Sequence, residues 1–308
     1  FCAKTVLCCQ KYGQLAHIPK VKRDLRCLRG EVCMQKKRRK VTEKDVERWI
    51  KEWLELVENG EYKPWLEVRE VPSIGRSRKV KGIKTGHIHH FLSDLEYYIY
   101  LMLEYDSSVT AIYEQYPLLP RNDTIEIANM MGIRHPVYPQ SSTPIVYSTD
   151  FVIEQRVASG EIIRKAITAK YSTNLATDKK ETKRKLHLME MERLAHAKNG
   201  IDLKCITEKA INKNMIYNLK WFIQDAALDN ELVQFTKDWA SLFKHQIMTK
   251  GEAKLSSILK EISEAMKITY ENSVRLFRHN MWNQTLKTDI SEKIELTNII
   301  KASDYFII

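Results

Sequence analysis

Residues 146–171 read VYSTDFVIEQRVASGEIIRKAITAKY, and the organisation of the larger part of the chain follows from this stretch. Two β-rich runs, 146–157 and 162–171, are separated by Ala-Ser-Gly, a pattern that predicts a β-hairpin. Asp150 enters the first predicted strand and Lys170 ends the second. A carboxylate beside apolar strand residues must be solvated, paired or bound to a metal, so Asp150 marks a candidate site.

The segments around this hairpin alternate between helical and extended patterns. Residues 42–58 carry apolar side chains at helical spacing, with Thr42 as a candidate cap. The other predicted elements are short strands within a loop at 71–90, a helix at 92–105, a strand at 109–116, a proline-punctuated stretch at 117–144, a helix at 178–198 and a strand at 202–207. This mixture predicts an α/β domain that spans residues 41–208.

Beyond residue 208 the pattern is almost wholly helical. Amphipathic stretches at 209–225, 229–248, 253–267 and 272–283 precede short β-like segments at 285–290 and 295–307. Because helix, turn, helix and ribbon form the order of a winged helix, we expect residues 209–308 to form a mostly helical, winged-helix-like domain. On the last helix, Arg275, Arg278 and His279 suggest DNA recognition, whereas the apolar residues between them favour a core position.

The positive charge of the chain is concentrated at its beginning. The formal net charge is +11, but residues 1–40 hold twelve Lys and Arg against two acids, so the remaining residues carry a net charge of only +1. The high isoelectric point is therefore no argument that the body of the protein binds DNA. No apolar run approaches the roughly eighteen residues of a membrane span, and no signal-peptide pattern is present, so we expect a cytoplasmic protein with no membrane partner.

Five of the six cysteines also lie in residues 1–40. Their spacing lacks the paired halves of a zinc site, which favours a basic, disordered extension over a metal-binding module. A third interpretation is that translation begins at Met34, because Met34 opens the run Met-Gln-Lys-Lys-Arg-Arg-Lys. In that case we expect residues 1–33 to be dispensable.

Glu96, in the run Ser93-Asp94-Leu95-Glu96, completes a set with Asp150 and Lys170. An acid on a helix, an acid entering a strand and a lysine ending the next strand form the layout of a metal-dependent nuclease. In such a site the carboxylates hold a divalent ion against the scissile phosphate, and the ammonium group helps to bind the attacking water. The plainer alternatives are a carboxylate that favours a helix N-terminus and a lysine at a strand edge.

A basic stretch precedes the helix of Glu96. It contains Arg76, Arg78, Lys79, Lys81 and Lys84, followed by His89 and His90. The stretch suits either contact with DNA phosphates or a solvated surface loop. Adjacent histidines rarely point the same way, so packing or DNA contact is favoured over a metal pair for His89 and His90.

The short sequence motifs around these residues resemble those of TnsA, the endonuclease subunit of heteromeric cut-and-paste transposons. The resemblance is dense between residues 60 and 171 and loose beyond. It rests on a collinear series: Trp65-Leu-Glu-Val-Arg-Glu-Val-Pro-Ser73, Gly75-Arg-Ser77, Lys84-Thr-Gly86, His89-His90, Ser93-Asp-Leu-Glu96, Tyr116-Pro-Leu-Leu-Pro120, His135-Pro-Val137 and Ser148-Thr-Asp-Phe151.

The resemblance implies a restriction-endonuclease-like catalytic domain joined to a winged-helix-like domain. It implies Mg²⁺-dependent cleavage of double-stranded DNA at the 5′ ends of the transposon, with Mn²⁺ as a substitute ion. Glu96, Asp150 and Lys170 fall on the family's catalytic positions, with Asp150 and Glu96 as metal ligands. The implied partners are a transposase subunit that cuts the 3′ ends and an ATPase regulator bound through the C-terminal domain.

Two positions need separate treatment. The family has Gln or an acid two residues before the lysine, where this chain has Thr168, whose hydroxyl or carbonyl oxygen is the remaining candidate metal ligand. Glu192 falls near another family acid, and its alternative is an exposed helix acid paired with a lysine such as Lys185. Two further functions stay open: a catalytically inactive assembly subunit, and a free-standing restriction or repair nuclease.

Overall fold

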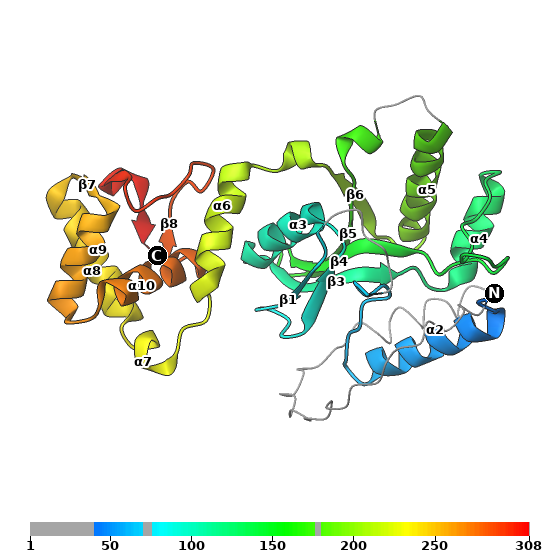
Figure 1. Cartoon of the computed structure of the whole chain (residues 1–308), viewed down its shortest axis with the longest axis horizontal. Coiled ribbons are helices and arrows are strands. Elements are labelled where there is room, and N and C mark those ends of the chain that lie inside the picture. Colours follow the sequence, from blue (N-terminus) through cyan, green and yellow to red (C-terminus); the bar gives the residue numbers. More distant parts are fainter. Residues whose placement is uncertain (1–39, 70–75, 176–179, 308) are drawn as a thin grey trace, which may run out of the picture.

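A four-stranded mixed sheet forms the centre of the larger lobe (Figure 1). The computed structural model describes residues 40–69, 76–175 and 180–307, so the predictions for the basic extension, its cysteines and Met34 lie outside the described residues. The strand order is β3 (Val109–Pro117), β4 (Ser148–Arg156), β5 (Ile162–Ala169), β6 (Asp202–Ile206). The first three strands are antiparallel, and β6 runs parallel to β5. The predicted hairpin is confirmed as β4 and β5.

Helices pack on and around this sheet. The elements are α2 (Glu43–Glu58), α3 (Asp94–Tyr105), α4 (Arg121–Met130) and α5 (Lys180–Ala197), with the antiparallel strands β1 (Arg78–Lys81) and β2 (Ile88–Phe91). The capping residue predicted for the first helix is confirmed, because Thr42 and Asp45 form a capping box. Buried residues of α3 pack in one core with the fully buried Phe151 of β4, while α5 packs against β6 and α4.

The helix α4 was not foreseen, because prolines surround its sequence. Pro120 precedes its first turn, where a proline removes no intrahelical hydrogen bond. Ile127 and Ala128 on α4 are buried in a small cluster with Met191 and Ala195 of α5. The amphipathic face of α4 therefore holds α5 in place beside the sheet.

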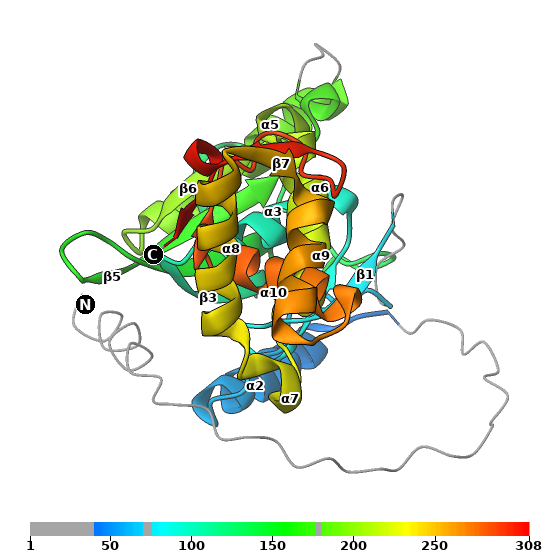
Figure 2. The ribbon, with the colours of Figure 1, turned by 90° about the vertical axis from the view of Figure 1, so that its left-hand side faces the viewer.

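The smaller lobe is helical, as predicted. It contains α6 (Lys213–Phe222), α7 (Asn230–Val233), α8 (Thr236–Lys250), α9 (Leu255–Met266) and α10 (Tyr270–Trp282). Figure 2 looks onto α8 and α9, with α10 behind them. Its short strands are β7 (Glu252–Lys254), β8 (Leu286–Lys287), β9 (Ile299–Lys301) and β10 (Phe306–Ile307).

The structure does not confirm the expected wing. Of the two β-like segments after α10, the first contains β8, and the second contains β9 and β10. The two segments pair with each other through β8 and β10, whereas β9 pairs with β7, which precedes α9. The end of the chain is therefore paired with a strand on the other side of α9 and α10.

The two lobes share a continuous core. Buried residues of α3 and α6 belong to one hydrophobic cluster. The Tyr105 hydroxyl donates to the carbonyl of Met281 at 3.2 Å, and the Gln284 amide donates to the carbonyl of Tyr105 at 2.7 Å. Among the described residues, no helix is both long enough and apolar enough to cross a bilayer.

Candidate active site

Glu96 is held in the first turn of α3 by a local capping arrangement. Ser93 is the N-cap and accepts from the Glu96 amide, and its hydroxyl donates to Glu96 Oε1 at 2.8 Å. The amide of Leu92 donates to Oε2 at 2.9 Å, and the residue is only 7% exposed. Burial and the nearby charge of Asp150 raise the pKa of Glu96 to about 7. Glu96 therefore caps its helix and lies close enough to Asp150 for the two charges to interact.

Asp150 lies on β4 and is oriented by the end of β5. Its Oδ2 accepts three hydrogen bonds: from the Thr168 hydroxyl at 3.1 Å, the Ala169 amide at 2.7 Å and the Lys170 ammonium at 3.0 Å. Burial lowers the pKa of Lys170, but Asp150 and Glu192 raise it more, so it stays above its usual value. The hairpin register thus brings the predicted acid and lysine into one ion pair.

Glu192 approaches the same group from α5. It is 1% exposed, so the alternative of an exposed helix acid paired with Lys185 is wrong. Burial raises the pKa of Glu192 to about 8, with a further contribution from Asp150 that Lys170 opposes. Of the two carboxylate oxygens, Oε1 is buried without a hydrogen-bond partner. A buried carboxylate oxygen in that condition is costly unless a cation or water satisfies it.

Gln115 belongs to the site, although no sequence pattern singled it out. It lies on β3, between residues that pair with Phe151 and Thr149, and therefore across from Asp150. Its backbone adopts φ of +48°, an uncommon value for a residue other than glycine. The buried side chain donates to Glu96 Oε2 at 3.4 Å and accepts from the Ser148 hydroxyl at 3.3 Å. Strained backbone of this kind is concentrated at functional sites.

We expect Gln115→Ala and Gln115→Gly to lower DNA cleavage equally, by roughly 3- to 10-fold, because both remove one hydrogen bond to Glu96. The two variants should differ in stability. Glycine adopts positive φ without a steric cost, so the Gly variant should unfold with a free energy about 1 kcal/mol higher than the Ala variant. Thermal unfolding and nicking assays measure the two effects separately. Wild-type cleavage by both variants would contradict a positioning role for Gln115.

The basic stretch divides into anchored and exposed residues. Arg78 is ion-paired with Asp94 and lies over the Tyr97 ring at 4.6 Å. The Lys84 ammonium donates to main-chain carbonyls at the end of α3 and the start of β3, including those of Leu103 and Val109. The side chains that remain exposed are Arg76, Lys79 and Lys81. DNA contact therefore stays a prediction chiefly for these three residues.

His89 and His90 are both buried, at 0% and 7% exposure. The imidazole of His89 lies against the carboxylate of Glu114, and His90 Nδ1 faces the amide of Val68. Of the two alternatives, packing is therefore the one that the structure supports, and neither side chain offers a surface for DNA.

Comparisons with known proteins identify the family of this chain. A model described as the TnsA-like endonuclease N-terminal domain matches residues 106–208, and the TnsA endonuclease C-terminal model matches residues 210–290. The transposon Tn7 transposition protein TnsA of Escherichia coli is 33% identical over 259 residues, which cover 83% of this chain and 90% of that protein. The chain therefore belongs to the TnsA family of transposition endonucleases.

Proposed function

We propose that this protein is the Mg²⁺-dependent endonuclease subunit of a heteromeric transposase, and that it hydrolyses phosphodiester bonds at the 5′ ends of the transposon. The observation that carries the proposal is the convergence of Glu96, Asp150, Lys170 and Glu192. They come from α3, β4, the residue after β5, and α5, and their charges act on one another. An inactive assembly subunit would have no reason to gather three carboxylates around one ammonium group.

The donor set fits a hard divalent cation. The candidate ligands Glu96, Asp150 and Glu192 offer carboxylate oxygens, which suit Mg²⁺ and also Mn²⁺. Burial and the charge of Asp150 raise the pKa values of Glu96 and Glu192, and the unpartnered Glu192 Oε1 lacks the hydrogen bond a buried oxygen normally has. A bound cation would relieve both conditions. When bound, it would supply a water of lowered pKa and neutralise charge on the phosphate.

The chain's own residues prepare that chemistry. Thr168 and the Ala169 amide orient Asp150, while Ser93 and Leu92 orient Glu96. The ammonium group of Lys170 lies beside Asp150. There it can bind the attacking water and offset negative charge that develops on the phosphate. The hydroxyl of Thr168 donates a hydrogen bond to Asp150, so its main role here is to orient that carboxylate, and direct metal contact stays a prediction.

Metal affinity should rise with pH. In the metal-free chain the pKa of Glu96 is about 7 and that of Glu192 about 8, against an ordinary value of 4.5, so both hold protons that a cation must displace. We expect Mn²⁺ binding, measured by titration, to strengthen between about pH 6 and about pH 8. The metal-free fold should lose stability over the range from about 4.5 to 8, because its raised pKa values favour the protonated folded state.

Two variants test the source of this dependence. Glu96→Gln removes one titrating group and should leave a shallower rise, whereas Glu154→Gln, on the same sheet and paired with Arg164, should keep the wild-type rise. An Mn²⁺ affinity that is the same at both ends of the range would show that neither carboxyl holds its proton as proposed.

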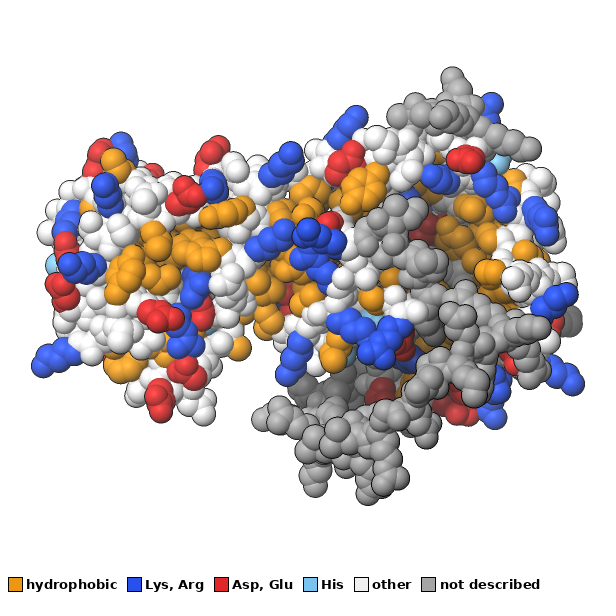
Figure 3. Space-filling view, in the orientation of Figure 1, with side chains coloured by type: hydrophobic (Ala, Val, Ile, Leu, Met, Phe, Trp, Pro, Cys, Tyr) orange, Lys and Arg blue, Asp and Glu red, His pale blue; other side chains and the backbone are white. Residues whose placement is uncertain are grey.

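The proposed partners are double-stranded DNA at the transposon ends, a transposase subunit that cuts the 3′ ends, and an ATPase regulator. We assign the regulator to the helical lobe. Arg275 bonds to Asp225 and Asp229, and Arg278 bonds to Asp225, so neither guanidinium is free to read bases. Figure 3 shows hydrophobic side chains gathered on this lobe, and its exposed apolar residues include Tyr217, Met248 and Ile299. Such a surface favours a protein partner.

A chain that begins at Met34, tested alone and with its partner subunits, separates the three functions. Because residues beyond 40 carry a net charge of only +1, we expect weak duplex binding and poor cleavage alone at physiological salt, and 5′-end cleavage in the assembly. Tight, sequence-specific binding and cleavage by the chain alone would favour a free-standing nuclease. An assembly that forms and cuts only the 3′ ends would identify an inactive subunit.

A further inference from the structure

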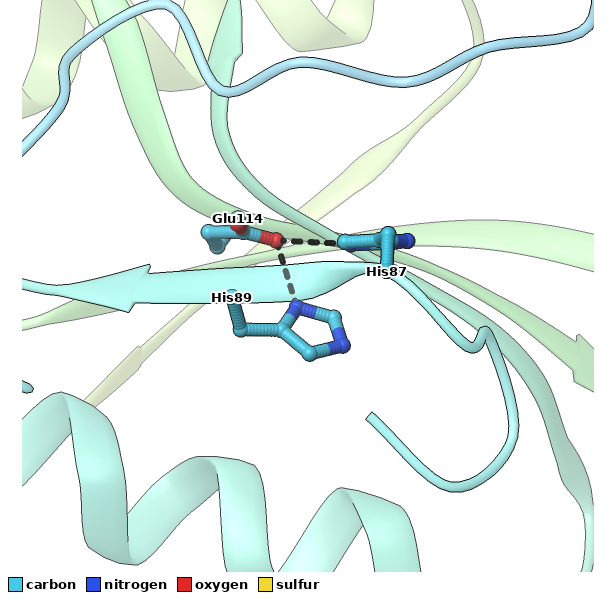
Figure 4. A group of neighbouring side chains, drawn as sticks. All are labelled: His87, His89 and Glu114. Atoms are coloured by element: carbon cyan, nitrogen blue, oxygen red, sulfur yellow. Dashed lines mark hydrogen bonds and ion pairs between the residues drawn. The ribbon is translucent and has the colours of Figure 1, made fainter. Parts of the chain in front are cut away.

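A second group of metal-ligating side chains lies outside the carboxylate site. His87, His89 and Glu114 meet between β2 and β3, and both imidazoles face the same carboxylate oxygen (Figure 4). His89 Nδ1 is 2.6 Å and His87 Nε2 is 3.4 Å from Glu114 Oε2. One ligand atom from each residue lies within 4.8 Å of the other two. Within β2, adjacent side chains point to opposite faces, which explains why the imidazole of His89 reaches this carboxylate and that of His90 does not.

The surroundings fix these side chains in orientation. Glu114 is 1% exposed, and its other oxygen, Oε1, accepts from the His90 amide at 3.1 Å. The second ring nitrogen of His89 is 2.9 Å from the Thr85 hydroxyl. Outer hydrogen bonds of this kind set the tautomer and orientation of metal-binding imidazoles and carboxylates. Within the described residues, the ion-pair partners of the buried Glu114 carboxylate are these two histidines.

We propose that His87, His89 and Glu114 bind one Zn²⁺ ion. Two imidazole nitrogens and one carboxylate oxygen are a zinc-type ligand set, and they differ from the carboxylates of the first site. With bonds of about 2.0–2.1 Å, tetrahedral zinc ligands lie about 3.3 Å apart. The His87–Glu114 pair already has this separation, and the His89–Glu114 pair must open by less than about 1 Å. The side chain of His87 is 20% exposed, which leaves water as the fourth ligand.

The ion would support the first site without taking part in its chemistry. It would fasten the start of β2 to β3, and β2 leads directly into Ser93 and the capped turn that holds Glu96. On β3 the residue after Glu114 is Gln115, which contacts Glu96. Zinc at this place would therefore stiffen both strands that position one catalytic carboxylate.

The test compares the chelator-treated full chain with two variants, His87→Ala and Asp150→Asn. Zinc is measured by elemental analysis after dialysis, and Co²⁺ is titrated as a probe, because tetrahedral Co²⁺ with nitrogen ligands absorbs strongly in the visible range. We expect wild type and Asp150→Asn to bind one Zn²⁺ per chain and to give the tetrahedral spectrum. His87→Ala should bind Zn²⁺ on the order of 100-fold more weakly. Zinc should also raise the unfolding temperature of the wild type and not that of His87→Ala.

Three results would overturn the proposal: no zinc retained by the wild type, unchanged binding by His87→Ala, or binding lost in Asp150→Asn. The last result would place the ion in the carboxylate site. If His87→Ala does not fold, chemical modification of the wild type decides the matter. Diethyl pyrocarbonate should modify the partly exposed His87 in the metal-free chain and not after Zn²⁺ is added. Equal modification in both conditions would show a hydrogen-bonded histidine pair without a metal.

Discussion

Asp150→Asn should reduce DNA cleavage by the assembled complex roughly 10³-fold. The side chain would keep an oxygen that can accept from the Ala169 amide and the Lys170 ammonium, so the local structure should persist. It would lose the negative charge that a divalent ion requires, and a bound ion contributes several kcal/mol to the stabilisation of the transition state. Nicking assays on transposon-end DNA, with Mn²⁺ titrations of the same protein, measure both consequences.

The matched control is Glu154→Gln, which makes the same chemical change on the same strand, at a carboxylate paired with Arg164. It should cleave as the wild type does. Asp150→Ala is less informative, because it leaves the Ala169 amide without its acceptor and should cost about 1–3 kcal/mol of stability. A well-folded Asp150→Asn protein with near wild-type cleavage would refute the assignment of Asp150 as a metal ligand.

Lys170→Met should lower cleavage about 10²- to 10³-fold while leaving metal binding intact. The variant preserves much of the side-chain volume but removes the ammonium that lies 3.0 Å from Asp150. A charge that stabilises the transition state in a largely desolvated site has an effect of this size. Metal affinity should stay equal or increase, because the positive charge that competes with the ion for Asp150 and Glu192 is gone.

Lys198→Met serves as the control, since Lys198 forms an exposed pair with Asp123 at the end of α5. Such pairs contribute little, so cleavage should be unaffected. The separation of cleavage from Mn²⁺ affinity is the critical observation for Lys170. If cleavage and metal affinity fell together, Lys170 would be maintaining the structure of the site, and its proposed role towards water and phosphate would be wrong.

The elements that could be predicted are those specified by local patterns. The β4–β5 hairpin follows from two β-rich runs and a turn. The helix α2 follows from periodic apolar residues after the capping residue Thr42, and α3 follows from an apolar stripe. The helix α4 was missed because the surrounding prolines conceal its start. The pairing of β7 with β9 could not be predicted, since strand partners far apart in sequence depend on how the helices between them pack.

For the site, the residue types and their order along the chain suggested Glu96, Asp150 and Lys170 as a nuclease-like set, and the resemblance to TnsA made the prediction specific. Their hydrogen bonds follow from the register of one hairpin and the cap of one helix, both of which are short-range. Glu192 and Gln115 are different. The charge of Glu192 matters because the packing of α5 buries this side chain, and Gln115 contacts Glu96 from a position of β3 where the backbone angle is unusual. Burial and convergence of distant segments are properties of the packed chain. Only the tertiary structure therefore revealed that Glu192 is buried, that Gln115 contacts Glu96, and that His87, His89 and Glu114 meet.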